Sequence, residues 1–580
     1  YFTLGPYGFY WFSLEPQPTE AMRIRALPSE EVLELPVLDE TKEGLFKKEN
    51  WYVLEGVLLE YMKGRRWFRG KAREPWVSKI QDVIPISFSG RTAYLVLIEV
   101  EYREGEPETY VVPLITSDSD RASELINEYP HALVANLKSD SKNSQRVLYD
   151  AMVDKDFDKF LLQAIGRKRH FKGEIGEISA SPTRIFRGAR GSDGASLDST
   201  PMKVEQSNTS VVYGDRLILK LFRRLEEGLN PDLEIGRFLT EKTSFEHISQ
   251  VAGSLEYILK VASQRVQGIL QSFVANEGDA WQYTLDSLGR YLQDVLLHPT
   301  VQAPPIPLKH MLSLPKEPPP LAKETVGPYL NSAQLLGQRT VELHVALASG
   351  LDDPDFAPDF FTHMYRTSLY QSMRSFTIRT LQILREQLTK IPEELRGDAQ
   401  QVLDLEKEII ERYQPIRKQK ISATRIRCHG DYHLGQVLYT GKDFVIIDFE
   451  GEPARSLSER RLKRSPLLDV AGMIRSFHYA AHSALIHHVP LAPRPEDDLP
   501  LLQHWAQYWY VWVSVTFLNS YLDIIRPVGL LPEDPEHLRI LLDAYILEKA
   551  IYEIGYELNN RPDWVKVPLQ GILQLMEAGS

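Results

Sequence analysis

The chain has 580 residues, too many for a single hydrophobic core, so we expect about two to four domains. Hydrophobic residues make up 43% and charged residues 25% of it, which is the composition of a soluble globular protein. The net charge of −12 argues against a nucleic-acid or anionic-membrane partner, because binding to phosphates requires clustered positive charge.

A single cysteine, Cys428, excludes internal disulfides and fits a reducing compartment. We interpret its thiol as a small buried group rather than a reactive one. The first twenty residues show no signal peptide, and the longest uncharged aromatic run, residues 505–521, is too short and too polar to span a membrane. We therefore predict a buried helix in this run and a cytoplasmic protein.

Extended and helical patterns alternate in residues 21–140, which we expect to form an N-terminal domain. Trp51–Met62 is typical of a strand, and Thr92–Glu101 with Glu108–Ile115 flanks the turn sequence REGEP as an antiparallel hairpin. From Ala122 to Gln163, charged and apolar residues follow the spacing of helices.

A second region, residues 141–300, contains short strands. The strand Arg216–Phe222 turns its leucines to one face and Lys220 to the other, and Asn230–Pro231 then begins a helix that carries Glu234. A strand lysine followed by an early-helix glutamate is the pattern of a kinase N-lobe, where this ion pair positions the lysine on the phosphates of the nucleotide. A surface lysine and a solvated glutamate are the alternative interpretation.

The stretch from Pro299 to Pro320 holds eight prolines and predicts an extended connector over residues 301–322. The remainder, residues 323–580, is mostly helical. Helical periodicity marks three stretches of it: Gln334–Ser349, Asp359–Lys390 and Arg539–Leu558.

One hairpin interrupts this helical region, and it carries two acidic motifs, HGDYHLGQ and IIDFEG. They place Gln436 five residues after Asp431, and Asp448 at the end of an apolar strand. Phosphoryl transfer needs a carboxylate that accepts the proton of the attacking hydroxyl, and oxygen ligands that hold Mg²⁺ against the phosphates. We therefore predict Asp431 as the base, and Gln436 and Asp448 as Mg²⁺ ligands beside ATP, in the order of a kinase catalytic loop.

Neighbouring features have two interpretations each. His429 either contacts the substrate or supports the loop, and Glu450 of DFEG either adds a metal ligand or faces the substrate. The basic run Arg455–Pro466 could neutralise phosphate, but we favour a solvated, mobile segment. No GxGxxG loop covers the phosphates, so we assign that contact to backbone N–H groups and small side chains of QSNTSV, namely Ser207, Asn208, Thr209 and Ser210.

One face of the last long helix combines polar groups with aromatic rings, a combination suited to a sugar. Lys549, Tyr552, Glu553 and Tyr556 are spaced i, i+3, i+4 and i+7, so they share that face. Packing of the tyrosines into the core is the alternative interpretation.

Taken together, these motifs resemble those of the maltokinases, within the clan of aminoglycoside-phosphotransferase-like small-molecule kinases. HGDYHLGQVL, IDFEGEP and SPLLDVAGMIRSF carry the likeness, as do RRWFRGKAR and EKAIYEIGYELNNRPDWVKVPLQGI, so that it covers about residues 21–580. The resemblance implies an α+β, bilobal, eukaryotic-protein-kinase-like fold with an extra N-terminal cap domain and a mostly helical C-lobe. It also implies ATP- and Mg²⁺-dependent phosphorylation of maltose at its anomeric hydroxyl, giving maltose 1-phosphate.

The resemblance extends to the substrate and to a partner enzyme. It implies that Lys549, Tyr552 and Tyr556 line the sugar pocket, and we predict that His429, Tyr432 and His433 contact the substrate as well. The aromatic stretch Tyr1–Pro16 resembles the last strand of the β-domain that closes α-amylase-type enzymes, including trehalose synthase, although an ordinary edge strand is the alternative. We expect residues 1–20 to be the remnant of such a domain, and trehalose synthase, fused or docked, to supply maltose on a route to α-glucan.

Two other functions compete with this one. The first is a kinase of the same fold that acts on an aminoglycoside, choline or another sugar, and the second is a non-catalytic module that regulates a trehalose synthase. The intact set Lys220, Asp431, Gln436 and Asp448 argues against the module. The tyrosine-rich helix suits a neutral disaccharide better than a polycation.

Overall fold

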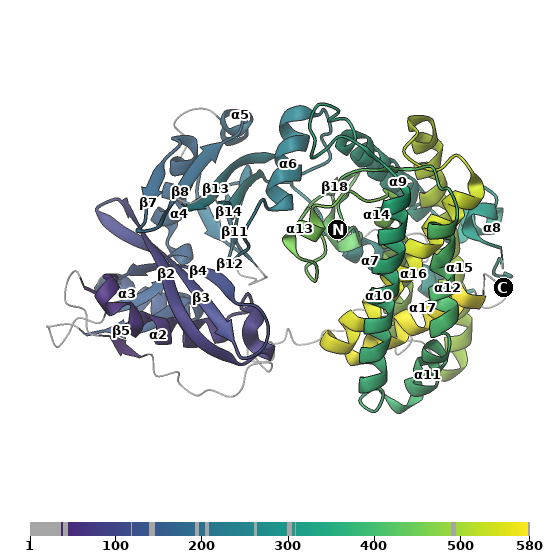
Figure 1. Cartoon of the computed structure of the whole chain (residues 1–580), viewed down its shortest axis with the longest axis horizontal. Helices are drawn as coiled ribbons and strands as arrows, with labels where there is room; N and C mark the ends of the chain where they lie inside the picture. Colours follow the sequence, from purple (N-terminus) through teal and green to yellow (C-terminus); the bar gives the residue numbers. More distant parts are fainter. Residues whose placement is uncertain are drawn as a thin grey trace.

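The structure is a computed structural model, and its sheets and helices separate along the chain. The N-terminal half holds two large sheets, and the C-terminal half is a helical lobe beside them (Figure 1). The residues that the structure describes are 36–38, 44–117, 119–138, 146–191, 197–202, 208–259, 264–298, 304–307, 309–488 and 495–577. The aromatic stretch Tyr1–Pro16 and Ser207 lie outside them.

The first sheet has the strand order β1-β5-β6-β4-β3-β2, and β12 pairs with β4 at its side. Its antiparallel pair β3–β4 confirms the hairpin expected around REGEP. The sheet buries apolar residues on both faces: α2 covers one, and the other shares a core with α4 and the second sheet. Its elements are β1 Val37–Leu38, α2 Trp51–Lys63, β2 Pro75–Phe88, β3 Arg91–Tyr102, β4 Glu108–Thr116, α3 Ser119–Glu128, β5 Leu133–Leu137 and β6 Arg146–Asp150.

The strand expected at Trp51–Met62 is wrong, because this segment forms the helix α2. Its buried side chains are Trp51, Leu54, Leu58, Tyr61 and Met62, spaced by three or four residues as on one helix face. Apolar residues between them gave the segment its strand-like appearance.

The continuous helical pattern expected from Ala122 to Gln163 is also only partly correct. Helices α3 and α4 (Lys155–Gly166) form near its two ends, but the strands β5 and β6 lie between them. Strand β5 pairs with β1 and β6, and β6 pairs with β4. Pairing with strands that are distant in sequence therefore decided the structure of these short apolar runs.

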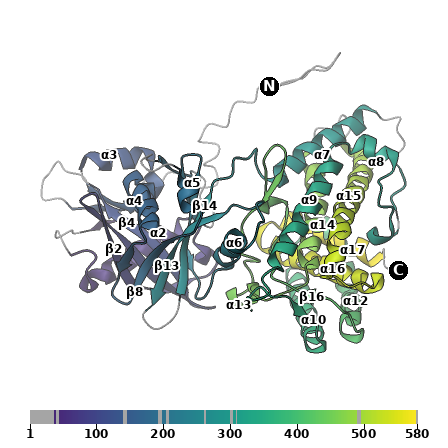
Figure 2. The same ribbon diagram turned by 90° about the horizontal axis from the view of Figure 1, so that it is seen from above.

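The second sheet has the order β7-β8-β13-β14-β11-β10-β9. Strand β11 confirms the predicted lysine strand, and the side chain of Asn230 caps α6 by accepting hydrogen bonds from the N–H groups of Asp232 and Leu233. Helix α6 lies at the junction with the helical lobe (Figures 1 and 2). The elements are β7 His170–Lys172, β8 Gly176–Pro182, α5 Phe186–Arg190, β9 Ser199–Pro201, β10 Asn208–Tyr213, β11 Leu217–Phe222, β12 Arg224–Leu225, α6 Pro231–Lys242, β13 Val251–Leu259 and β14 Gln264–Ser272.

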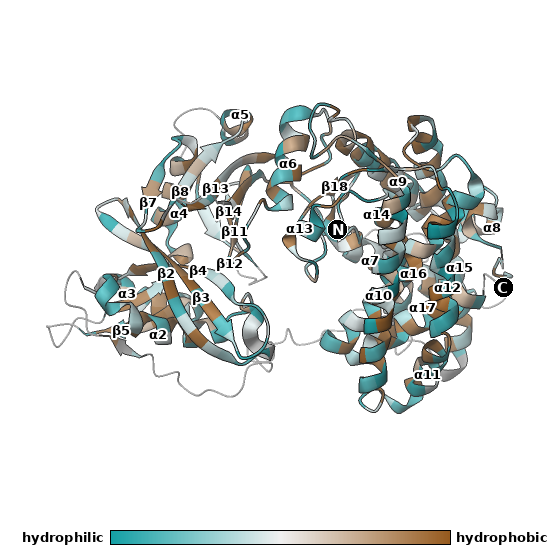
Figure 3. Ribbon diagram, in the orientation of Figure 1, coloured by the Kyte–Doolittle hydropathy of each residue, from teal (hydrophilic) through white to brown (hydrophobic). Residues whose placement is uncertain are grey.

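In the helical lobe, α9 packs along α15, and α14 packs against both α15 and α16. The run 505–521 lies within α15 and is largely buried, as predicted. Apolar residues line the faces that these helices turn to one another (Figure 3). The helices are α7 Ala280–Leu297, α8 Pro320–Thr325, α9 Tyr329–Leu347, α10 His363–Gln387, α11 Arg396–Asp404, α12 Glu406–Lys418, α13 Leu457–Arg460, α14 Leu467–His488, α15 Pro495–Ile525, α16 Pro535–Asn560 and α17 Lys566–Glu577.

Two short antiparallel strand pairs lie within the helical lobe, and one of them confirms the predicted hairpin. They are β15 Asp359–Phe360 with β16 Thr424–Arg425, and β17 Val437–Tyr439 with β18 Phe444–Ile446. Short 3₁₀ helices complete the fold: η1 Lys48–Asn50, η2 Arg69–Ala72, η3 Pro130–Ala132, η4 Ala151–Val153, η5 Met311–Ser313, η6 Glu393–Leu395, η7 Leu434–Gln436, η9 Arg526–Val528 and η10 Pro562–Val565.

The described residues of the proline-rich stretch, 304–307 and 309–320, contact the helical lobe. The carbonyl oxygen of Pro304 lies 2.5 Å from Nε2 of His504 on α15, and Nε2 of His310 lies 2.7 Å from the Asp543 carboxylate on α16. Across the described part of the chain, no helix has the length and apolar character needed to cross a membrane.

The helical assignment of α2 yields a stability prediction. In a strand, positions 52 and 58 would face the same side, whereas in α2 Leu58 is fully buried and Tyr52 is 72% exposed. Leu58→Ala is expected to lower the free energy of unfolding by about 2–5 kcal/mol, because it leaves a cavity. The matched variant Tyr52→Ala is expected to change it by less than about 0.5 kcal/mol in the same denaturant titration. Equal losses in both variants would contradict the helix.

Candidate active site

The two lobes meet where α6 and β11 approach the segment that follows β18. Strand β18 hydrogen-bonds toward the N-terminal half, because the N–H of Ile446 donates to the carbonyl oxygen of His247 at 2.9 Å. The next residues, Asp448 to Glu450, therefore arrive opposite β11 and α6. This junction brings together the predicted lysine and both acids of DFEG.

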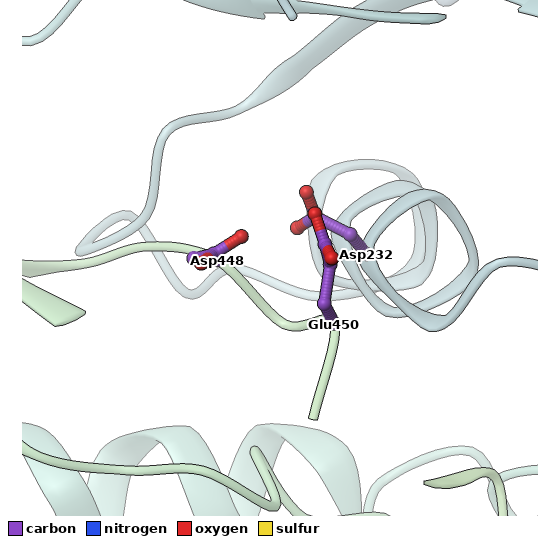
Figure 4. Close-up of side chains that lie close together, drawn as sticks. All are labelled: Asp232, Asp448 and Glu450. Carbon is purple, nitrogen blue, oxygen red and sulfur yellow. The ribbon is translucent and has the colours of Figure 1, made fainter. Parts of the chain in front are cut away.

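The ammonium group of Lys220 lies among three carboxylates. It is 2.6 Å from Glu450 and 3.2 Å from Asp232, and it also forms an ion pair with Asp448. The three acids point toward one another from α6 and from the segment after β18 (Figure 4). The lysine of the second sheet thus contacts acids of both lobes.

Asp232 is the acid that the sequence analysis missed. Its Oδ2 pairs with Lys220, and its Oδ1 accepts a hydrogen bond from the N–H of Phe449 at 3.0 Å. Because Asn230 already caps α6, the carboxylate of Asp232 is available for these contacts. The signal was present in the sequence, since Asp232 is an acid in the first turn of the same helix as Glu234.

The expected ion pair between Lys220 and Glu234 is wrong. Glu234 instead forms ion pairs with Arg427 at 2.9 Å and Arg461 at 2.7 Å, both in the helical lobe. Residues two apart on a helix point about 200° away from each other, so Asp232 and Glu234 cannot face the same partner. Asp232 takes the lysine, and Glu234 fastens α6 to the helical lobe.

The expectation of a solvated segment at Arg455–Pro466 is only partly correct, because its arginines form ion pairs although Ser456, Glu459 and Leu462 are exposed. Arg460 is buried and pairs with Glu226 at 2.5 Å, and Arg461 pairs with Glu234. Arg455 forms an ion pair with Glu452. The acids that pair with Arg460 and Arg461 are distant in sequence, and composition alone does not show such pairing.

The geometry at Asp448 is strained and supported by a neighbour. Its φ of 66° lies in the left-handed region, which is unfavourable for a residue with a side chain. The amide Nε2 of Gln436 donates to its Oδ2 at 3.0 Å. In this structure Gln436 therefore orients Asp448, and its role as a metal ligand stays a prediction.

The three acids fit a divalent cation. Carboxylate oxygens of Asp232, Asp448 and Glu450 lie within 4.8 Å of one another, and Mg²⁺ prefers oxygen ligands. Burial raises the pKa of Glu450 and Lys220 opposes this, but the like charges of Asp448 and Asp232 leave it above its ordinary value. The single positive charge of Lys220 therefore does not fully neutralise the negative charge of the three carboxylates.

Asp431 lies next to the aromatic face of α16. Nζ of Lys549 is 3.0 Å from its Oδ1, and Nε2 of His433 is 3.9 Å from its Oδ2. Burial raises the pKa of Asp431, but Lys549 and His433 outweigh it and lower the pKa to about 2. The carboxylate is thus fully ionised near neutral pH.

Lys549, Tyr552 and Tyr556 lie together on α16 as predicted, but Glu553, expected on the same face, is buried and pairs with Arg475. Nζ of Lys549 lies 4.5 Å from the centre of the Tyr552 ring, and the Tyr552 and Tyr556 rings stack with centres 6.3 Å apart. Tyr556 is 46% exposed, so the face is open to solvent. The structure brings this face to Asp431, and sugar binding by it stays a prediction.

Two residues of the HGDYH segment do not face a substrate. The ring of Tyr432 is buried in the helical core, and its hydroxyl lies 3.0 Å from Oγ1 of Thr340. His429 is buried, and its Nε2 lies 2.9 Å from the carbonyl oxygen of Ile447. The substrate contacts expected for both are corrected to support of the loop, whereas His433 remains beside Asp431.

Asp469, of the SPLLDVAG motif, holds the same loop from α14. Its carboxylate accepts hydrogen bonds from the N–H groups of His429 at 2.8 Å and Gly430 at 2.9 Å. Nε2 of the buried His344 lies 3.0 Å from it. The sequence analysis did not assign this acid a role. Cys428, which precedes the loop, is buried as expected.

The predicted phosphate-binding stretch is described from Asn208 onward. Nδ2 of Asn208 donates to Glu450 at 3.3 Å, which places it beside the acid cluster. Oγ1 of Thr209 accepts from Nε of Arg223, and Ser210 pairs with Lys220 across the β10–β11 ladder. Their contact with a nucleotide stays a prediction.

Comparisons with known proteins agree with this architecture. A family model described as the maltokinase N-terminal cap domain matches residues 61–154. A glucosamine kinase of Mycolicibacterium smegmatis (strain ATCC 700084 / mc(2)155) is 24% identical over 384 residues, 66% of this chain and 80% of the relative. A glucosamine kinase of Streptacidiphilus jiangxiensis is 22% identical over 383 residues, 64% of this chain and 72% of the relative.

A solved structure shares the fold over most of this chain. It is a glucosamine kinase in complex with glucosamine, ADP and inorganic phosphate, with a TM-score of 0.56 and 16% identity, covering 89% of this chain and 98% of that one. The expected kinase-like fold with an N-terminal cap, a sheet-rich N-lobe and a helical C-lobe is therefore confirmed. The cap domain and these relatives support a maltokinase-type kinase. The relatives that the chain resembles are sugar kinases, named as glucosamine kinases.

The two acids of α6 are expected to behave differently on substitution. Asp232→Asn keeps the shape but removes the charge that faces Lys220, so we expect kcat/KM for the nucleotide to fall on the order of ten- to a hundredfold. Glu234→Gln, the matched control on the same helix, is expected to lower the melting temperature while leaving nucleotide affinity within about twofold. Steady-state kinetics measure kcat/KM, and calorimetric nucleotide titration and thermal unfolding measure the affinity and the melting temperature of both variants. The reverse pattern would show that Glu234 is the lysine's functional partner.

The pair Lys549–Asp431 generates a pH prediction. Asp431 is ionised above its pKa of about 2, so its protonation does not limit activity near neutral pH. Lys549 is the main group that lowers the pKa of Asp431, whereas burial raises it. In Lys549→Met this pKa should therefore rise, and the acid limb of the kcat/KM profile is expected to move to higher pH. Lys316→Met, on an exposed lysine of the same lobe, is the control that should leave the profile unchanged. An unshifted acid limb in Lys549→Met would contradict the pairing.

Proposed function

We propose that this protein is an ATP-dependent maltokinase, which transfers the γ-phosphate to the anomeric hydroxyl of maltose and releases maltose 1-phosphate and ADP. The observation that carries the proposal is the ionised Asp431 held by Lys549 beside the open tyrosine face of α16. The match of residues 61–154 to the maltokinase cap supports it. The ADP and phosphate bound to the glucosamine kinase structure support the use of ATP.

Asp431 has two tasks in this reaction. It accepts a hydrogen bond from the anomeric hydroxyl and so orients the oxygen toward the γ-phosphorus. As the new O–P bond forms and the bond to the β-phosphate oxygen breaks, the hydroxyl proton passes to the carboxylate. A pKa of about 2 makes Asp431 a weak base, which suits a loose transition state in which the proton moves late.

Mg²⁺ belongs to the proposal as the neutralising charge for the nucleotide. Asp448, Glu450 and Asp232 would hold the ion, with Gln436 orienting Asp448 as it does in the structure. When bound, the ion would neutralise charge on the β- and γ-phosphates. Lys220, whose ammonium group lies in the same cluster, would then bind the phosphates of the nucleotide.

Glucosamine is the second candidate substrate, because the relatives are named as glucosamine kinases. The charges near Asp431 favour a neutral sugar. In the described residues, Glu452 pairs with Arg455 and lies 3.9 Å from Lys549, and Glu548 lies 3.5 Å from Arg455. Glucosamine carries an ammonium group, which would have to compete with Arg455 and Lys549 for these acids.

The cellular setting completes the proposal. A trehalose synthase, fused to this chain or docked on it, would supply the maltose, and both enzymes would work in the cytoplasm. The acceptor chemistry is consistent with this order, since trehalose has no free anomeric hydroxyl while maltose has one. Conversion of trehalose to maltose must therefore precede phosphorylation.

The acceptor assay tests the proposed function directly. With ATP and Mg²⁺, maltose is expected to give a ³¹P NMR signal of a 1-phosphate, and trehalose is expected to be inert. Glucose should react poorly, because it lacks the second ring that helps to orient the first. Asp431→Asn should reduce the maltose rate by about 10²–10⁴-fold and serves as the blank. Faster turnover of glucosamine than of maltose, or a 6-phosphate product, would overturn the maltose assignment.

A further inference from the structure

The RRWFRGKAR segment of the cap domain reaches the junction between the kinase lobes. A narrow pocket of about 30 Å³ lies next to the acid cluster and takes its walls from all three parts of the protein. The cap contributes Trp67 and Arg69 to it. The other walls include Asn208 and Arg224 of the N-lobe and Glu450 and Arg460 of the C-lobe.

The cap holds Arg69 rigidly at this pocket. Trp67 and Phe68 are buried, and their rings lie 6.1 and 5.1 Å from the ring of Tyr110 on β4. The N–H of Arg69 donates to the hydroxyl of Tyr110 at 3.3 Å. Strand β4 is itself paired with β12 of the N-lobe. The backbone at Arg69 is therefore fixed relative to the nucleotide-binding lobe, while its side chain stays accessible to solvent.

The guanidinium groups around the pocket are unequally paired. Arg224 forms ion pairs with Glu108 at 2.8 Å and Glu226 at 2.6 Å, and Arg460 pairs with Glu226. The guanidinium of Arg69 has no hydrogen bond or ion pair to any residue that the structure describes. Burial and the neighbouring Arg224 lower the pKa of Arg69, although it remains charged. Glu450 and Glu226 only partly oppose this shift, so an arginine crowded by like charge and without a direct acid partner suits an anionic ligand.

The wall opposite Arg69 belongs to the predicted nucleotide site. Asn208 begins β10 and belongs to the stretch assigned to the phosphates, and it donates to Glu450. Glu450 in turn pairs with Lys220 at 2.6 Å. The phosphate tail of a nucleotide that reaches Lys220 would therefore pass beside this pocket.

We propose that Arg69 of the cap domain is a nucleotide-binding residue, whose guanidinium contacts the phosphates of the donor. The inference rests on the proposed function only in that the donor is an adenine nucleotide. It makes the cap part of the binding site, so that a bound nucleotide links the cap to the C-lobe. The ligand is anionic phosphate rather than the base, because the pocket walls are lined with charged groups.

Nucleotide titration of Arg69 variants tests this inference. In Arg69→Ala the Kd values of ADP and ATP, measured by calorimetry without sugar, are expected to rise about tenfold or more. The Kd of adenosine, which has no phosphate, is expected to stay unchanged. Arg69→Lys keeps the charge but not the paired N–H groups, so it should restore affinity only in part. The KM for the sugar should not change in either variant.

Arg103→Ala is the matched control. Arg103 is also a cap arginine, but it is exposed, lies over Trp76 and pairs with Glu74 at 3.1 Å. The Arg103→Ala variant should bind ADP, ATP and adenosine with the same Kd values as the unsubstituted protein. Unchanged affinity for ADP and ATP in a folded Arg69→Ala variant would overturn the inference, as would an equal loss for adenosine. Since no sugar is present, a wrong acceptor assignment would leave this result intact.

Discussion

The ion cluster of Lys220 with Asp232, Asp448 and Glu450 is the interaction on which the arrangement of the lobes depends. Its four charges come from β11, from α6 and from the segment after β18. Partly buried carboxylates repel one another, and they lie this close only when a cation stands among them. The lysine therefore holds the acids of DFEG opposite α6, and it does so at the place where phosphoryl transfer needs positive charge.

A second set of ion pairs surrounds this cluster and stabilises the same junction. Glu234 on α6 forms ion pairs with Arg427 and Arg461 of the C-lobe, and Glu226 forms one with Arg460. Pairs of this kind are costly to desolvate, so they contribute more to defining one arrangement of the lobes than to net stability. The arginine-rich segment after DFEG is thus a structural connection between lobes, because Arg460 and Arg461 pair with acids of the N-terminal half.

The sugar side of the junction is built from α16. Lys549 reaches Asp431 from the same helix face that carries the two stacked tyrosines, and Glu553, one turn further, pairs with the buried Arg475 at 2.6 Å. This pair fixes the rotation of α16 about its axis. The base and the aromatic face therefore keep a constant relation, which positioning catalysis requires.

The sequence by itself determined the elements and the order of the catalytic motifs. Asn230–Pro231 begins α6, and Lys220 lies on the predicted strand. Asp431 and Asp448 flank the β17–β18 hairpin in kinase order. These features follow from the sequence because helix caps, turns and the alternation of apolar residues in strands act over a few residues. The tertiary structure decided which charges meet. It paired Lys220 with Asp232 instead of Glu234, buried Tyr432 and His429, and gave the basic run its acids. It also made Trp51–Met62 a helix, because apolar side chains spaced by three or four residues are buried against the first sheet only in a helix. These outcomes depend on groups up to about two hundred residues apart in the chain, and no local pattern encodes the direction from which a distant partner arrives.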